Sequence, residues 1–202
     1  MDADWSVELG ADDAALEFPW FSPDGSQRYV DLQRHKELLA EIPEAAQFPE
    51  LGEFLHAINQ ARTPWRTAKC DVWFNDELGE AEAIYDARLK LCSYVDLILR
   101  EDAARLSFER HEQWVKSAAG ALASDDESPV ACEFIVRRCW YHADANHRRS
   151  NDDEATQGDK SPVPGFHVSF YLFGYGDVED EARTRWAAGL LQAAAMLTAL
   201  AA

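Results

Sequence analysis

The sequence has little positive charge. Nineteen Lys and Arg residues stand against 37 Asp and Glu residues, which gives the 202-residue chain a formal net charge of −18. A nucleic-acid-binding protein needs a basic surface that displaces phosphate counterions, and no segment of this chain provides one. We therefore expect no nucleic-acid partner. The acidic clusters either form a solvated surface that keeps the protein soluble or attract a basic protein partner, and both interpretations stay open.

The sequence also lacks an apolar run long enough to cross a membrane. The charge-free apolar run over residues 187–202 is shorter than the roughly 20 residues that a span requires, and Gln192 and Thr198 interrupt it. The first residues, MDADWSVELGADD, are acidic and lack the basic and apolar regions of a signal peptide. We therefore expect a cytoplasmic protein that does not contact a membrane.

No pair of cysteines has the CxxC spacing of a metal or redox motif. The four cysteines, Cys70, Cys92, Cys132 and Cys139, lie in apolar segments that resemble strands. A cysteine in such a segment usually behaves as a small hydrophobic residue. In a reducing cytoplasm we expect all four to be free thiols and no structural disulfide to form.

Short catalytic motifs are missing as well. The chain has no nucleophile elbow, no glycine-rich phosphate loop, no HExxH sequence and no kinase signature. The segment 139–149, CWYHADANHRR, contains four residues of types that bind zinc. They are Cys139, His142, Asp144 and His147. Their spacing matches no established zinc pattern, and in a continued strand Cys139 and His142 would point to opposite faces. We therefore predict a strand end with no metal and no other cofactor.

Residues 1–66 are predicted to form an N-terminal arm with helices. WSVEL near the start alternates as in a short strand, and the proline-containing, aromatic segment that follows is irregular. Residues 31–47 are expected to form one helix that stops near Pro43, and residues 47–62 a second helix. Four apolar residues of the second helix share one face: Leu51, Phe54, Leu55 and Ile58.

From Thr67 onward the pattern is strand, strand, helix, and it occurs twice, over residues 67–125 and 130–202. Both units open with a cysteine followed by an acidic residue. We predict one α+β domain over residues 1–202, with a mainly antiparallel sheet of four to five strands and two helices on one face. Two repeated ββα units would explain the pattern, and chance similarity of two common hairpin–helix units is the alternative.

A polar linker joins the last two predicted strands. Its composition of charged and small residues cannot bury enough apolar surface to offset the entropy of ordering the backbone. We expect residues 148–160 to be mobile and dispensable for stability.

The last predicted strand has one wholly apolar side and one mixed side. If helices cover the apolar side, the other side carries His167, Ser169 and Tyr171, joined by Arg137 and Tyr141 from the neighbouring strand. This face is either the floor of a ligand site or is covered by the N-terminal helices, and covering is the more ordinary arrangement. If a small molecule binds, these five residues are the candidate ligand-binding residues.

Two classes of function fit the sequence. The first is a non-enzymatic binding protein that engages a basic protein partner, and the second is a small-molecule-binding protein or enzyme that uses the polar face of the sheet. The lack of a catalytic motif favours the first without deciding whether the protein is an enzyme. The last predicted helix has an apolar stripe of Trp186, Leu190, Ala193, Leu197 and Leu200. Its segment 187–202 is uncharged, and Leu191 and Met196 are apolar although they lie outside the stripe, which also favours a homodimer.

Overall fold

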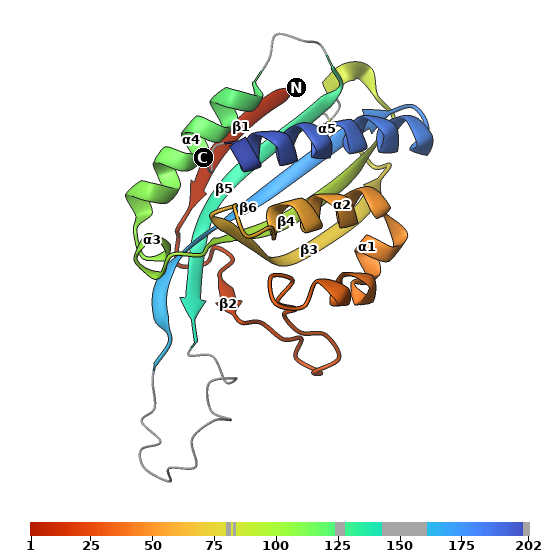
Figure 1. Ribbon diagram of the computed structural model, residues 1–202. Coiled ribbons are helices and arrows are strands. Elements are labelled where there is room, and N and C mark those ends of the chain that lie inside the picture. The colour runs from red at the N-terminus through yellow and green to blue at the C-terminus, as the bar shows by residue number, and fades with distance from the viewer. Residues whose placement is uncertain (80–81, 83, 124–127, 143–160, 200–202) are drawn as a thin grey trace, which may run out of the picture.

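A mixed sheet with α-helices packed on one side forms the core of the protein (Figure 1). The computed structural model describes residues 1–79, 82, 84–123, 128–142 and 161–199. Within these residues the sheet has six strands in the order β1-β5-β6-β4-β3, with β2 also paired to β5. The strands are β1 (Asp2–Glu8), β2 (Leu16–Phe18), β3 (Trp65–Asn75), β4 (Leu89–Leu99), β5 (Val130–Tyr141) and β6 (Val163–Gly176).

The helices follow the N-terminal arm and the two strand pairs. They are the 3-10 helix Lys36–Glu41, α1 (Pro43–Gln47), α2 (Pro49–Ile58), the 3-10 turn Ile84–Asp86, α3 (Asp102–Arg105), α4 (Phe108–Leu122) and α5 (Glu179–Ala199). In Figure 1, α2, α4 and α5 all lie in front of the sheet. The α+β class is therefore confirmed. The sequence predicted two helices on one face of the sheet, but three long helices, α2, α4 and α5, share this face, which we call the helical face.

The prediction of a mainly antiparallel sheet of four to five strands is only partly right. β3, β4, β6 and β5 pair antiparallel, whereas β1 and β2 both run parallel to β5. Parallel strands need a long connection, and the chain between β1 and β5 is long enough to provide it. The alternation in WSVEL predicted a strand correctly, but it carried no information about the direction of its partner.

Two predicted helices have different boundaries. Residues 31–47 do not form one helix that stops at Pro43, because Pro43 begins α1. Proline suits the first turn of a helix, where its missing N–H would have no partner. The helix predicted after β4 is divided into α3 and α4 at Ser107, whose side chain accepts a hydrogen bond from the Arg110 N–H and caps α4.

The helical face of the sheet carries the main hydrophobic core. The predicted apolar face of α2 is buried there, and the ring of Phe54 stacks on Phe170 of β6 at a centroid distance of 5.8 Å. Phe170 in turn stacks on Phe134 of β5 at 4.9 Å, and Trp114 of α4 meets Phe134 edge-on at 5.6 Å. One row of aromatic rings thus links α2, the two central strands and α4.

Helix α5 lies unusually close to strand β6. A Cβ atom on Gly174 would lie 2.3 Å from the Ala182 carbonyl oxygen and 2.4 Å from the Trp186 nitrogen, so this approach requires glycine. Trp186 is fully buried, and its indole N–H donates to the Ser93 hydroxyl of β4 at 2.8 Å. Removing a side chain buried in this way typically costs about 3–5 kcal/mol.

Strand β4 is buried on both sides. Lys90 and Asp96 lie on the side of β4 that faces away from the core, and yet they are only 5% and 6% exposed. A charged residue is rarely buried unless it is paired, so both positions require partners. These partners lie on the second face of the sheet and are described below.

The internal repeat stays a prediction. The order strand, strand, helix does occur twice, but the two cysteine–acid pairs are not equivalent in register. Cys70 pairs with Val95, whereas Cys132 pairs with Leu172. Aligning the similar sequences SYVDLIL and FHVSFYL makes Val95 equivalent to Val168. In a true repeat Cys132 would therefore pair with Val168, but the residue that pairs with Val168 is Val136.

Some expectations fall outside the described residues. They include the predicted mobile segment 148–160 and Leu200 at the end of the α5 stripe. Among the described residues, no helix combines the length and apolar character that crossing a membrane requires.

Burial of His111 predicts a loss of stability in mild acid. Burial lowers its pKa, the hydrogen bond to the Ser107 carbonyl offsets part of this effect, and His167 adds to it. As pH falls below about 6.5, the unfolded chain takes up a proton that folded His111 does not, so the free energy of unfolding decreases. Urea denaturation at pH 7.5 and 5.5 should show that the free energy of unfolding decreases less for His111→Gln than for the wild type. Equal decreases in the two proteins would show that His111 does not cause the loss of stability.

The outer side of α5 predicts self-association. Leu191 is 73% exposed and no charged residue occurs from 187 to 199, whereas Met196 packs against the core. The aromatic arm does not cover this surface, because Phe18 and Trp20 pack on the opposite face of the sheet.

Sedimentation at micromolar concentration should show a dimer for the wild type and a monomer for Leu191→Lys. Gln113→Lys, an exposed position on α4, adds the same charge and should stay dimeric. A monomeric wild type would rule out the dimer.

Candidate functional site: the open face of the sheet

The second face of the sheet is not covered by α2, α4 or α5, and we call it the open face. The expectation that N-terminal helices cover it is wrong, because α2 buries its apolar side against the helical face. The irregular arm reaches one end of the open face, where Phe18 packs with Ile98, Cys139 and Tyr141. The central part of the open face therefore lies beyond both the arm and these helices.

The strand register aligns five side chains across the open face. Asp4 of β1 pairs with Glu133 of β5, Glu133 with Tyr171 of β6, Tyr171 with Tyr94 of β4, and Tyr94 with Asp71 of β3. Paired residues point to the same side of a sheet, and four strand spacings of about 4.8 Å make this row roughly 19 Å long. We call it the cross-strand row.

Arg137 is the centre of a hydrogen-bond network beside this row. Its Nε donates to Glu8 Oε2 at 2.8 Å, and its Nη1 donates to the Tyr171 hydroxyl at 3.0 Å and to Ser169 Oγ at 3.3 Å. Burial lowers the pKa of Arg137, but the hydrogen bonds to Tyr171 and Glu8 outweigh it and raise the pKa above its usual value. Arg137 therefore holds Tyr171 in place as a permanently charged donor.

Ser169, His167 and Asp96 form a cluster that does not have the geometry of a hydrolase. Ser169 Oγ donates to Asp96 Oδ1 at 2.6 Å, and His167 Nε2 lies 3.4 Å from the same oxygen. His167 Nδ1 lies 3.1 Å from the Arg138 carbonyl oxygen. A catalytic histidine faces the nucleophile with one nitrogen and the carboxylate with the other, whereas here Nε2 faces both. Ser169 and His167 are also only 1% and 2% exposed, so a substrate cannot reach them.

Of the five predicted ligand-binding residues, the structure brings four together. Arg137, His167, Ser169 and Tyr171 share the network, whereas Tyr141 lies at the end of the open face covered by the arm. The Tyr141 hydroxyl donates to the Phe166 carbonyl at 2.6 Å, away from this group. Of the four, Tyr171 lines a cavity, and Arg137 holds its hydroxyl in place.

A cavity of about 260 Å³ opens over the middle of the open face, and we call it the central cavity. Trp73, Tyr171 and Phe173 provide aromatic walls, Cys92 and Ile135 apolar surface, and Glu133 a carboxylate. Because these residues come from four strands, the sheet register alone brings them together.

Lys90 lies at one side of the central cavity and is already paired. Its Nζ donates to Glu82 Oε1 at 2.6 Å and lies 4.8 Å from the centre of the Phe173 ring. The hydrogen bond from Lys90 lowers the pKa of Glu82. One carboxylate thus neutralises the charge of the buried lysine, and an aromatic face stabilises it further.

A second, larger cavity adjoins the β3 edge. It has a volume of about 710 Å³ and is lined by arm residues such as Trp20, by Glu44 of α1 and by Asp71 and Tyr94. Tyr94 and Tyr171 lie with their ring centres 5.7 Å apart, so this tyrosine pair separates the edge cavity from the central cavity.

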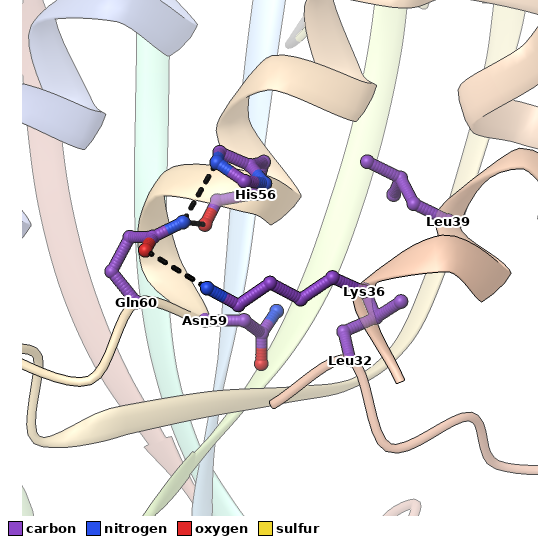
Figure 2. A pocket seen from close by; sticks show the side chains of 6 residues that line it. All are labelled: Leu32, Lys36, Leu39, His56, Asn59 and Gln60. Atoms are coloured by element: carbon purple, nitrogen blue, oxygen red, sulfur yellow. Dashed lines mark hydrogen bonds between the residues drawn. The ribbon is translucent and has the colours of Figure 1, made fainter. Parts of the chain in front are cut away.

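The small pocket beside α2 is not a candidate site. Figure 2 shows Lys36 donating to Gln60, which also contacts His56 on the same rim. Its volume of about 10 Å³ is close to the space of one water molecule.

The suggestive segment 139–149 is described only as far as His142. Cys139 is buried on the open-face side under the arm, whereas exposed His142 pairs with Glu17 of β2. Asp144 and His147 lie outside the described residues. Among the described residues there is no group of three or more His, Cys, Asp or Glu side chains that could hold a metal.

Sequence reasoning missed Asp96, Glu133, Tyr94 and Trp73. The alternation of β4 does place Tyr94 and Asp96 on one side, but only pairing with β6 shows that this is the side of His167. No pattern within β3 or β5 indicates that Trp73 and Glu133 border one cavity. No family model, curated protein or solved structure matches this chain.

The four cysteines are predicted to be unreactive in the folded protein. Burial raises the pKa of Cys92 to about 11 and of the other three to about 12, so the reactive thiolate is scarce at neutral pH. Iodoacetamide at pH 7 should modify the native protein slowly. In denaturant without reductant, mass measurement should find four modified thiols, since all four are free. Two or fewer would contradict the free-thiol assignment.

Proposed function

We propose that the protein is a non-enzymatic binding protein whose open face engages a basic protein partner. The cross-strand row carries this proposal, because three acidic side chains flank its two tyrosines on a face that the long helices leave uncovered. A partner with positive charge would find complementary charge along the whole row.

Among the described residues, no salt bridge neutralises Asp4, Glu133 or Asp71 on this face. Its two central cations, Lys90 and Arg137, already pair with Glu82 and Glu8. By contrast, Asp4 accepts a hydrogen bond from the backbone N–H of the next residue, and so does Asp71. These carboxylates keep their attraction for an external cation, in line with the net charge of −18.

The aromatic side chains supply contact area of the kind that dominates protein interfaces. Trp73 is 39% exposed at the β3 side, and Tyr94, Tyr171 and Phe173 are half-buried beside it. Tryptophan and tyrosine are enriched among the residues that contribute most to binding free energy. Aromatic rings surrounded by acidic groups favour a basic partner over an apolar one.

The alternative, a small-molecule-binding protein or enzyme on the same face, has less support. The Ser169 cluster is inaccessible and lacks the order of a catalytic triad, and the thiols are protonated at neutral pH. Two cavities separated by Tyr94 and Tyr171 suit an extended partner with several side chains better than one compact ligand.

A basic peptide should bind, and two carboxylates of the row should matter. Calorimetric titration with a ten-residue peptide of alternating Lys and Arg should show binding that weakens as salt rises from about 50 to about 300 mM. Glu133→Gln with Asp4→Asn should reduce the affinity roughly three- to tenfold, since each exposed charge pair contributes about 0.2–1 kcal/mol.

The matched control removes the same charge from the helical layer. Glu53 of α2 and Asp180 of α5 are both exposed, and Glu53→Gln with Asp180→Asn should leave the affinity within about twofold of wild type. Equal losses in both double variants would show that only net charge matters and would overturn the proposed face.

A further inference from the structure

We infer that the central cavity receives the guanidinium group of an arginine from the partner. This inference rests on the proposed function, because it names the side chain that anchors a basic partner on the open face. The cavity, at about 260 Å³, is slightly smaller than the 300–1,000 Å³ typical of drug-sized ligands, which suits a single side chain.

The walls match the two surfaces of an arginine side chain. Trp73, Tyr171 and Phe173 present aromatic rings, on which a planar guanidinium stacks more favourably than a compact ammonium. Cys92 and Ile135 are buried at the same cavity and offer apolar contact to the methylene groups.

Glu133 supplies the charge that the guanidinium needs. Its Oε1 accepts a hydrogen bond from Ser6 Oγ at 2.8 Å, which orients the carboxylate, and its Oε2 accepts no hydrogen bond from the described residues. The carboxylate therefore keeps an oxygen for a charge-assisted hydrogen bond from an arginine N–H. Directly across the strands, Tyr171 is fixed by Arg137, so the aromatic wall beside Glu133 is preorganised.

The protein itself contains the same kind of interaction within this cavity. Lys90 places its ammonium 4.8 Å from the Phe173 ring centre and pairs with Glu82. A cation between an aromatic face and a carboxylate is thus stable in this environment. The Arg137 guanidinium already lies 5.5 Å from the centre of the Tyr171 ring. A cation from outside therefore finds the same two components in Glu133 and the ring of Trp73, which line the same cavity, and Lys90 is already paired with Glu82.

The test uses small arginine derivatives and the indole N–H signal of Trp73. The ¹⁵N-labelled full chain is titrated with N-acetylarginine amide, N-acetyllysine amide or N-acetylcitrulline amide, and the variant Trp73→Phe assigns the indole signal. Citrulline matches arginine in size without its charge, so this comparison on the wild type does not depend on the folding of any variant.

The arginine derivative should shift the Trp73 signal saturably and bind at least severalfold more tightly than the lysine derivative, while the citrulline derivative should leave the signal nearly unchanged. Glu133→Gln should weaken binding at least tenfold, which corresponds to about 1.4 kcal/mol, because it removes a charge-assisted hydrogen bond. Glu53→Gln should bind like the wild type, as Glu53 lies exposed on α2.

Three results would overturn the inference. They are a Trp73 signal that does not respond, equal responses to arginine and citrulline derivatives, and equal binding of the lysine derivative. If the Lys-Arg peptide still binds through the row in any of these cases, the anchor is wrong and the proposed function stands. If the peptide fails to bind as well, both are wrong.

Discussion

The close contact between α5 and the sheet is the constraint on which the rest of the structure depends. Gly174 lets the backbone of α5 approach β6, and Trp186 fills the space between α5 and β4 with its N–H satisfied by Ser93. Arg183 of α5 then pairs with Glu50 of α2 through two hydrogen bonds, which adds α2 to the same layer. Once this layer is formed, the apolar sides of the central strands are covered, and their other sides face away from every long helix.

That arrangement explains why charged residues are buried in the middle of a sheet. Lys90 and Asp96 alternate with apolar residues in β4, so burying the apolar side in the core directs both to the open face. Each then needs a partner, because an unpaired buried charge is strongly destabilising. Glu82 and the aromatic rings neutralise Lys90, while Ser169 and His167 surround Asp96. Ser169 also accepts a hydrogen bond from Arg137, which donates to the Tyr171 hydroxyl, so the network that stabilises the sheet also shapes the candidate binding surface.

Hydrophobic periodicity predicted much of the site but not its limits. The mixed side of β6 was correctly distinguished from its apolar side, and Arg137 of β5 was placed beside it, because both statements depend only on alternation along a strand. Tyr141 was grouped with them by the same reasoning, but it lies where the arm crosses the sheet. Glu133 and Trp73 could not be assigned, since they approach the central cavity only through the register of strands far apart in the sequence.

The sequence by itself determined the α+β class, the existence of β3 to β6, the apolar face of α2 and the buried stripe of α5, because these follow from local spacing of apolar residues. Tertiary structure decided the parallel direction of β1 and β2, the position of α2 on the helical face and the uncovered state of the other face. It also decided which acidic and aromatic residues form one row. Pairing between distant strands depends on which surfaces are buried together, and local sequence patterns do not encode that choice.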